Sequence, residues 1–279
     1  MALSGEAVST FIIAELGVNH QGDMKVATKL IVAAKEAGAD ACKFQTYDPD
    51  ILEPPGPRRE MLRRLMLSHG QHRVLKAQVE RRGMEFISTP FDVPSLRFLV
   101  DELKVKTLKI ASGNLDNWPL LEAAADSRCH VIVSTGGASL AQVAKIEWVS
   151  RAATLRVLHC VSAYPASVGM MNLAVLPKMD DLMVDGVGLS DHTTSLLIPA
   201  LAVAMGATVI EKHLTLDRNA DGPDHRASLE PEQFKIMVDN IREAELAMGD
   251  GVKRPQACEA AAMAVMAERK AWREQLPTN

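Results

Sequence analysis

Short apolar runs alternate with longer stretches of helical periodicity along this chain. The stretches Met24–Ala37 and Ser68–Arg82 place apolar residues every three or four positions, as amphipathic helices do. Glycine follows several such stretches, at Gly38, Gly83 and Gly206, where a left-handed residue commonly ends a helix. We therefore predict strands and helices in regular alternation. The predicted strands are Phe11–Glu15, Ala41–Gln45, Glu85–Ser88, Thr107–Ile110, Val131–Ser134, Arg156–Cys160, Gly186–Leu189 and Thr208–Lys212.

The number and spacing of these elements predict an α/β fold, the (β/α)8 TIM barrel. Eight strands, each followed by a helix, within about 250 residues are typical of that barrel. A doubly wound open sheet is the alternative, but its first strand is commonly followed by a glycine-rich phosphate-binding turn. Here the first strand is followed by GVNHQGD instead. We expect a single barrel domain over residues 1–279, with a helical extension at 255–279. Because it is rich in proline, we expect Leu52–Arg59 to be an irregular loop after the second strand.

Composition narrows the class of protein. A hydrophobic fraction of 47% in 279 residues suffices for a large core, and a net charge of −4 gives no basic field for nucleic acid or a membrane surface. The N-terminus lacks the signal-peptide pattern, and no apolar run is long enough to span a bilayer. The four cysteines are dispersed without a CxxC pair, so we expect reduced thiols and a cytoplasmic protein.

Two lysines lie within predicted strands, at Lys43 and Lys109. A lysine is costly to bury in a barrel strand unless it meets an anion. Barrel sites form at the carboxyl ends of strands, where Ser112, Ser134 and Ser190 add hydroxyl donors. Lysine with hydroxyl and backbone donors suits phosphate, so these residues predict an anion clamp. The alternative is that each lysine pairs with a structural carboxylate.

Two histidines, His192 and His213, lie at the ends of the last two strands, flanked by Asp191 and Glu211. Imidazoles and carboxylates with open coordination positions suit Mn²⁺, Mg²⁺, Fe²⁺ or Zn²⁺. The pair therefore predicts a divalent metal site, and the lack of a third soft ligand argues against a closed structural zinc. The alternative is that both are hydrogen-bonded imidazoles without a metal.

Other polar residues lie at the ends of the remaining strands. Glu15 ends the first strand and is a candidate for acid–base work or substrate binding, the alternative being an ion pair at the bottom of the barrel. His20, in the loop that follows, is a candidate substrate contact. His159 is a further polar strand residue, for which a structural role is the simpler interpretation.

The chain resembles the N-acetylneuraminate (sialic acid) synthase family in collinear blocks that cover almost all of residues 11–255. The blocks are IIAELGVNHQGD, AGADACKFQTY, EFISTPFD, LKIASGNLDNWPLLE, VIVSTGGASL, VLHCVSAYPA, VGLSDHT, GATVIEKHLTLD, GPDHRASLEP and GDGVKRP. The resemblance implies a carbon–carbon bond-forming transferase. Such an enzyme condenses phosphoenolpyruvate with an N-acylmannosamine-like aldose to give a sialic-acid-like nonulosonic acid and phosphate.

The resemblance also implies roles for individual residues. His192 and His213 would hold Mn²⁺ or Mg²⁺, which polarises the open-chain aldehyde, and Glu15 would act in acid–base chemistry or orient water. Members of the family self-associate, which implies a homo-oligomer. The implied phosphoenolpyruvate ligands are Lys43, Thr89, Lys109, Ser112, Ser134 and Ser190, and the implied sugar contacts are Gln45, Tyr164 and Asp224.

The sequence departs from the family pattern in four places. Asn114 stands where the family usually has Glu, so one acid–base role is lost or moves to Glu15 or a metal-bound water. Ser162 stands where Asn is common, and the loop after the second strand is shorter than usual. The sequence ends near the end of the barrel, so we expect no antifreeze-like domain, which in the family supplies an arginine to the N-acyl group.

These departures leave two alternatives to a sialic-acid-type synthase. The first is a related 3-deoxy-ulosonate synthase that takes a different or a phosphorylated aldose. Its candidate phosphate ligands are Arg58, Arg59, Arg63 and Arg64, although an exposed helical face is the simpler interpretation of these arginines. The second is a non-catalytic paralogue that binds a sugar or a partner protein.

Overall fold

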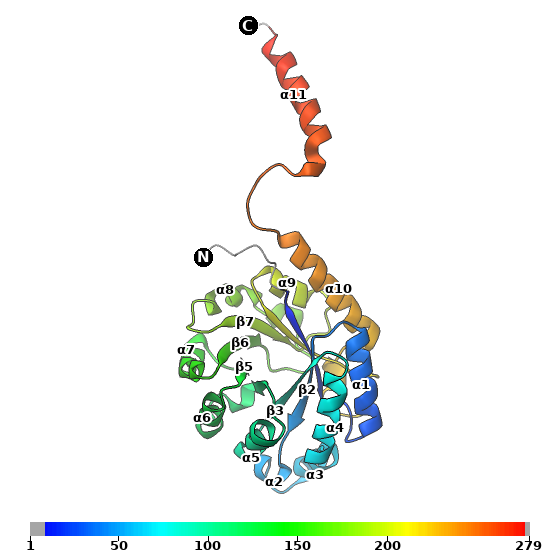
Figure 1. Cartoon of the computed structure of the whole chain (residues 1–279), viewed down its shortest axis with the longest axis vertical. Helices are drawn as coiled ribbons and strands as arrows, with labels where there is room; N and C mark the ends of the chain where they lie inside the picture. The colour runs from blue at the N-terminus through cyan, green and yellow to red at the C-terminus, as the bar shows by residue number, and fades with distance from the viewer. Residues whose placement is uncertain (1–8, 277–279) are drawn as a thin grey trace. The chain divides into compact units, whose positions relative to one another are not determined.

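A closed barrel of eight parallel strands forms the centre of the computed structural model, which describes residues 9–276 (Figure 1). The strands follow one another in chain order, and β1 pairs with β8 to close the barrel. This confirms the predicted (β/α)8 TIM barrel. The strands are β1 (Phe11–Gly17), β2 (Ala41–Thr46), β3 (Glu85–Pro90), β4 (Thr107–Ile110), β5 (His130–Ser134), β6 (Thr154–Cys160), β7 (Gly186–Asp191) and β8 (Val209–His213).

Helices connect successive strands and cover the outside of the barrel (Figure 1). The glycines predicted to end helices, Gly38, Gly83 and Gly206, have positive φ angles of 89°, 70° and 99°. Among the described residues, no helix is both long and apolar enough to cross a membrane. The α-helices of the barrel unit are α1 (Met24–Glu36), α2 (Pro49–Leu52), α3 (Pro57–Leu65), α4 (His69–Glu80), α5 (Val93–Arg97), α6 (Trp118–Asp126), α7 (Leu140–Ala144), α8 (Leu176–Met179), α9 (Ile198–Ala204) and α10 (Pro231–Met248).

The barrel unit ends at Ala247, and the chain from Met248 onward belongs to a second unit. That unit contains the predicted C-terminal helix, as a 3₁₀ turn at Ala257–Glu259 followed by α11 (Ala260–Glu274). The α11 side chains are exposed, among them Met266 and Trp272.

The prediction of an irregular loop at Leu52–Arg59 is wrong in part. Leu52 ends α2, and Pro57 begins α3, so Arg58 and Arg59 lie in a helix. Proline is compatible with the first turn of a helix, because the N–H that it lacks has no intrahelical partner there. The prolines of this segment therefore mark the start of a helix as well as a break.

The apolar core has two layers, one between the strands and the helices and one inside the barrel. The inner layer consists of Ile13, Ala41, Ile87, Ile132, Leu158 and Val209. Side chains two positions apart on a strand point to the same face. Each of these strands therefore carries another inward side chain two residues closer to its carboxyl end. Those residues are Glu15, Lys43, Thr89, Ser134, Cys160 and Glu211, so a polar layer lies directly on an apolar one.

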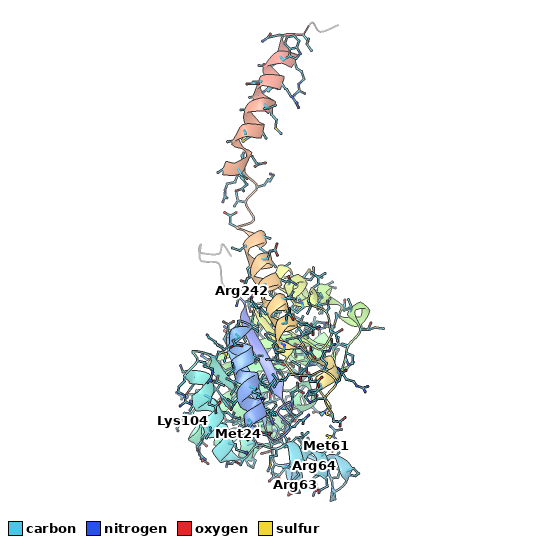
Figure 2. The ribbon with its side chains drawn as sticks, turned by 90° about the vertical axis from the view of Figure 1, so that its right-hand side faces the viewer. Met24, Met61, Arg63, Arg64, Lys104 and Arg242 are labelled. Atoms are coloured by element: carbon cyan, nitrogen blue, oxygen red, sulfur yellow. The ribbon has the colours of Figure 1, made fainter. Side chains whose placement is uncertain are left out.

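Hydrogen bonds tie α10, the last helix of the barrel unit, to the first two strands. Arg242 donates from Nη1 to the Thr10 carbonyl at 3.0 Å and from Nη2 to Asp40 Oδ2 at 3.3 Å. Asp40 in turn accepts from the Ile12 backbone N–H at 2.8 Å. Figure 2 shows Arg242 on α10, beside the barrel. These contacts hold α10 against the amino-terminal ends of β1 and β2.

Gly188 provides a test of packing inside the barrel. A Cβ atom there would lie 2.3 Å from the Val209 carbonyl oxygen and 2.7 Å from Leu158 Cδ2. We expect Gly188→Ala to lower the free energy of unfolding by about 3 kcal/mol, because the clash involves backbone that cannot move aside. Urea unfolding followed by circular dichroism measures this. Gly169→Ala is the control, since its Cβ would meet nothing within 4 Å, and equal stability of the two variants would contradict the packing argument.

Candidate active site

A pocket with a cavity volume of about 200 Å³ opens at the carboxyl ends of the strands. It is lined by every residue to which the family resemblance assigns a catalytic, substrate-binding or metal-binding role. Those residues are Glu15, Lys43, Gln45, Thr89, Lys109, Ser112, Ser134, Tyr164, Ser190, His192, His213 and Asp224. The barrel therefore gathers into one cavity side chains that are spread over more than 200 positions of the chain.

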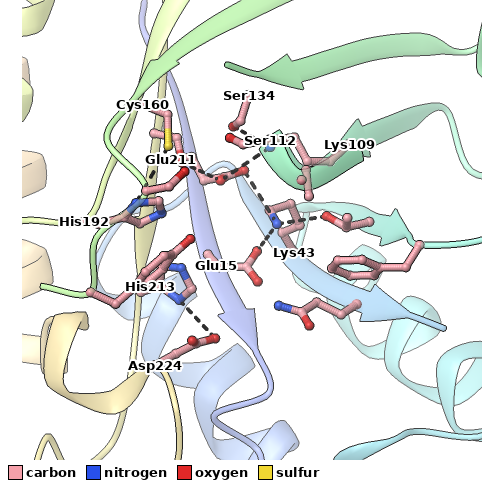
Figure 3. Close-up of a pocket in the computed structure, with 18 residues that line it drawn as sticks. Glu15, Lys43, Lys109, Ser112, Ser134, Cys160, His192, Glu211, His213 and Asp224 are labelled. Atoms are coloured by element: carbon pink, nitrogen blue, oxygen red, sulfur yellow. Dashed lines mark hydrogen bonds and ion pairs between the residues drawn. The ribbon is translucent and has the colours of Figure 1, made fainter. Parts of the chain in front are cut away.

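The floor of the pocket is a cluster of two buried lysines and two buried carboxylates (Figure 3). Lys43 forms an ion pair with Glu15, and its Nζ lies 3.7 Å from Glu211 Oε2. Lys109 Nζ lies 3.8 Å from Glu211 Oε1, which also accepts a hydrogen bond of 2.8 Å from Ser190 Oγ. Glu211 thus lies between the two ammonium groups, and the charges of the four side chains balance.

Burial and charge act against each other on these groups. Burial alone lowers the pKa of Lys43, but the carboxylates of Glu15 and Glu211 outweigh it, so the pKa is raised. Burial also lowers the pKa of Lys109, and there Glu211 offsets the effect only in part. For Glu211 burial raises the pKa, but Lys109 and Lys43 outweigh it and the pKa is lowered.

Two hydroxyl groups that line the cavity accept hydrogen bonds from the lysines. Lys43 Nζ donates to Thr89 Oγ1 at 3.0 Å, and Lys109 Nζ donates to Ser134 Oγ at 2.6 Å. Each hydroxyl accepts from a cation and keeps its own proton for another acceptor. Both lysines therefore present a charge and a hydroxyl donor to the same space, which suits a phosphate or a carboxylate.

Two carboxylates line the pocket with pKa values near the neutral range. Burial, together with the carboxylates of Glu211 and Asp224, raises the pKa of Glu15 to about 7 despite the charge of Lys43. Burial raises the pKa of Asp224 to about 6. Glu15 can therefore hold or release a proton near neutral pH, as a general acid or base must.

The two pocket histidines lie side by side, with ring centroids 5.5 Å apart. His192 Nδ1 lies 2.9 Å from the Val161 carbonyl, to which it donates, and this leaves Nε2 unprotonated in the neutral ring. Burial lowers the pKa of both imidazoles, that of His213 to well below its ordinary value. His213 Nδ1 is buried 3.9 Å from Asp224 Oδ2 and has no hydrogen-bond partner among the residues that the structure describes.

These features fit a divalent metal with few protein ligands. Both imidazoles are neutral, which is the form that binds metals, and one ring nitrogen lacks a partner. Within residues 9–276, no group of three or more His, Cys, Asp or Glu side chains is placed to hold an ion. Two imidazoles would leave coordination positions for water or substrate, as in a catalytic site and unlike a structural zinc site.

Several polar residues considered from the sequence lie away from the pocket. His20 is buried with its ring 6.2 Å from that of Phe44, and it is not among the residues that line the cavity, so the expected substrate contact is wrong. His159 Nε2 lies 2.6 Å from the Met171 carbonyl. Asn114 is nearly buried, and its neighbour Gly113 lines the cavity in its place.

The pocket also contains residues that sequence reasoning did not assign to it. Glu211 was noted only as a flank of the metal site, and Phe91 and Cys160 were not considered. A signal existed for two of them: Glu211 lies two positions before His213, and Cys160 two positions after Leu158, on the inward faces of their strands. Cys160 Sγ lies 3.7 Å from His192 Nδ1.

Comparison with known proteins agrees with this geometry. The sequence matches the profile of the NeuB family over residues 30–253. The chain belongs to the NeuB family. It is 43% identical over 273 residues to the N,N'-diacetyllegionaminic acid synthase of Legionella pneumophila, covering 90% of this chain and 76% of that protein. This confirms the resemblance drawn from the sequence blocks.

Two further relatives support the assignment. The human N-acetylneuraminate-9-phosphate synthase is 37% identical over 268 residues, covering 90% of this chain and 74% of that protein. The crystal structure of N-acetylneuraminic acid (sialic acid) synthetase from Leptospira borgpetersenii, in complex with citrate, superposes with a TM-score of 0.85 at 35% identity. It covers 99% of this chain and 96% of that one. The prediction of a synthase-type transferase is confirmed, and a non-catalytic NeuB paralogue is not supported.

Lys212 is a third buried lysine, but it does not line the pocket and has a structural role. It lies next to Glu211 on β8 and points to the opposite face, where Nζ pairs with Asp191 Oδ2 at 2.5 Å with both side chains fully buried. We expect Lys212→Met to lower the free energy of unfolding by about 3 to 5 kcal/mol, because it leaves a buried charge unpaired.

The control for this variant is Lys235→Met, which breaks an ion pair with Asp239 whose side chains are 58% and 60% exposed. Exposed pairs contribute about 0 to 1 kcal/mol, so this variant should unfold at nearly the wild-type urea concentration. Chemical denaturation of both variants checks the prediction. Equal losses of stability in the two variants would contradict the conclusion that the buried Lys212–Asp191 ion pair stabilises the fold.

Proposed function

We propose that this NeuB-family protein condenses phosphoenolpyruvate with an unphosphorylated N-acylated aldose, giving a nonulosonic acid and phosphate. The observation that carries the proposal is the pair of buried lysines on the pocket floor, each linked to a hydroxyl donor, beside two neutral imidazoles. The relatives are named as synthases of N,N'-diacetyllegionaminic acid and of N-acetylneuraminate 9-phosphate, which supports a nonulosonic acid as the class of product.

Phosphoenolpyruvate is a small molecule with two anionic groups, and the pocket floor offers two cationic donors. Lys43 with Thr89 and Lys109 with Ser134 would each receive one anionic group. Ser112 and Ser190 line the same cavity and would complete the donor set. Because Glu15 and Glu211 already balance the lysines, the arriving anion must compete with these carboxylates for the ammonium groups.

The reaction needs one carbon–carbon bond and one water. C3 of phosphoenolpyruvate attacks the aldehyde carbon of the open-chain aldose, and the aldehyde oxygen gains a proton to become a hydroxyl. Water adds at C2 and loses its protons, and the C2–O bond to phosphate breaks, which releases inorganic phosphate and leaves a ketone. Glu15, with its pKa raised to about 7, would take or return a proton in this reaction.

His192 and His213 would hold a divalent cation, Mn²⁺ or Mg²⁺. When bound, such an ion supplies Lewis-acid polarisation of the aldehyde oxygen. The hydrogen bond from His192 Nδ1 to Val161 fixes the ring so that Nε2 is the nitrogen available for coordination. Tyr164 packs against His192 with ring centroids 4.0 Å apart and restrains its orientation further.

The sugar would occupy the part of the pocket lined by Gln45, Tyr164 and Asp224, which offer neutral and acceptor groups to hydroxyls. The only cationic side chains that line the cavity are Lys43 and Lys109, within the part of the chain that the structure describes. Both belong to the floor. The pocket therefore suits a neutral aldose better than a phosphorylated one.

The arginines considered for a sugar phosphate do not line this pocket. Arg59 and Arg63 both pair with Asp50, at 3.0 and 2.6 Å, and Arg58 pairs with Glu53. Figure 2 shows Arg63 and Arg64 on the helix α3 at the edge of the barrel. These observations favour the interpretation of an exposed helical face.

The proposal is tested by mixing the protein with phosphoenolpyruvate, Mn²⁺ and a panel of aldoses, each with and without a terminal phosphate. We expect equal amounts of phosphoenolpyruvate lost, phosphate released and product formed, with N-acylated unphosphorylated aldoses as the best substrates. Mass spectrometry identifies the product by its mass, and chelation of the metal should stop turnover. Tight binding of phosphoenolpyruvate without turnover of any aldose would contradict the proposal.

Lys109→Met tests the anion clamp separately from the sugar. The variant keeps the length of the side chain and removes the charge, so we expect phosphoenolpyruvate to bind roughly 10- to 150-fold more weakly, as for the loss of a hydrogen bond to a charged group. Isothermal titration calorimetry measures this. Lys106→Met, at an exposed position just before β4, is the control and should bind normally. Normal affinity in Lys109→Met would contradict the role of the floor.

A further inference from the structure

The segment after β8 carries Asp224 to the sugar side of the pocket and returns to the barrel. Its two ends are pinned together, since the Leu229 N–H donates to the His213 carbonyl and the Thr215 N–H donates to the Leu229 carbonyl, both at 2.9 Å. Between these points the segment 216–223 is largely exposed. The position of Asp224 therefore depends on how the interior of the segment is anchored.

A buried imidazole provides that anchor. His225 is only 3% exposed, and its Nδ1 lies 2.7 Å from Thr215 Oγ1. Its Nε2 lies 3.3 Å from Gln21 Nε2, an amide nitrogen that also donates to the Asp221 carbonyl at 3.0 Å. An amide nitrogen can only donate, so His225 Nε2 accepts and Nδ1 carries the proton that goes to Thr215. The ring thus joins the segment to the end of β8 and to the loop after β1.

Neighbouring residues leave room for the His225 ring and add a second link to the segment. A Cβ atom on Gly222 would lie 2.7 Å from His225 Cδ2, so glycine lets the backbone pass against the imidazole. A second link runs through Ser228, whose Oγ donates to the Asp224 carbonyl at 2.7 Å and accepts from Asn19 Nδ2 at 2.9 Å. We refer to His225 with Thr215 and Gln21 as the His225 latch.

We infer that His225 is a positioning residue that holds the Asp224 carboxylate against the sugar half of the site. His225 does not line the pocket, whereas Asp224 does, with Oδ2 lying 3.9 Å from His213 Nδ1 (Figure 3). The residues of the pocket floor lie on strands, so the latch does not fix their positions. The latch should therefore affect the aldose and leave phosphoenolpyruvate unaffected, an inference that rests on the proposed function.

The kinetic test varies one substrate at a time in His225→Ala. We expect kcat/KM for the aldose to fall about 100-fold, the scale on which a displacement of 1 Å near a reacting centre acts, and KM for phosphoenolpyruvate to stay within about twofold. His225→Asn keeps a donor toward Thr215 and loses the acceptor for Gln21, so it should recover part of the loss. Equal effects on both substrates, or none on either, would overturn the inference.

The matched control is His130→Ala. His130 also has a nitrogen, Nδ1, within hydrogen-bond distance of a threonine hydroxyl, Thr154 Oγ1 at 2.9 Å, but it lies at the amino-terminal end of β5 and is exposed. It should show wild-type kinetics with both substrates. A comparable loss of aldose kcat/KM in His130→Ala would show that removal of any such imidazole harms the enzyme generally.

Hydrogen exchange provides a readout that does not depend on activity. In His225→Ala, backbone amides of 216–228 should exchange at least tenfold faster than in wild type, while amides of β2 and β4 should be unchanged. Unchanged exchange in 216–228 contradicts the latch whatever the kinetics show. If the wild-type protein turns over no aldose, the proposed function fails, and the exchange result still decides whether the latch exists.

Discussion

The structure depends on burying two lysines inside a barrel. An ammonium group inside a protein is costly unless a carboxylate or a bound anion compensates for it. Glu15 and Glu211 compensate here, and Lys43 pairs closely with Glu15. Lys109 Nζ, in contrast, lies 3.8 Å from Glu211 Oε1, so its compensation is looser than in the Lys212–Asp191 pair, where the ammonium lies 2.5 Å from its carboxylate. A loosely compensated cation at the base of a cavity favours an entering anion.

The period of a β-strand explains why this cluster forms where it does. Residues two apart share a face, so Ile13 and Glu15, or Val209 and Glu211, stack along the barrel axis. The apolar layer closes the bottom of the barrel, which leaves the carboxyl ends of the strands as the open side of the charged layer. Because the charged layer stacks directly on the inner apolar layer, the floor of the site is part of the barrel core.

Much of this could be predicted from the sequence, because strand alternation and glycine-terminated helices are local signals. The same local reasoning predicted the lysines, serines and histidines of the pocket at or near strand ends, whereas the roles of Gln45, Thr89, Tyr164 and Asp224 came from the family resemblance. It failed where the outcome depends on tertiary contacts. The sequence does not reveal that Lys212 points away from Lys43, that His20 packs beside Phe44, or that His225 joins Gln21 to Thr215 across 200 positions. Leu52–Arg59 was misjudged because proline both interrupts and begins helices.

The pocket has a floor built on strands and a side near Asp224 that relies on a loop. Under the proposed function the floor would recognise a small anion, and the loop side would contact the sugar and could vary while the floor stays the same. The central claim is that phosphoenolpyruvate binds on Lys43 and Lys109, beside a cation held by His192 and His213. A crystal structure with phosphoenolpyruvate and Mn²⁺ tests it most directly. We predict anionic oxygens within hydrogen-bond distance of both lysine Nζ atoms and a Mn²⁺ ion that contacts both imidazoles. Phosphoenolpyruvate bound elsewhere, or a cation that contacts neither histidine, would contradict the claim.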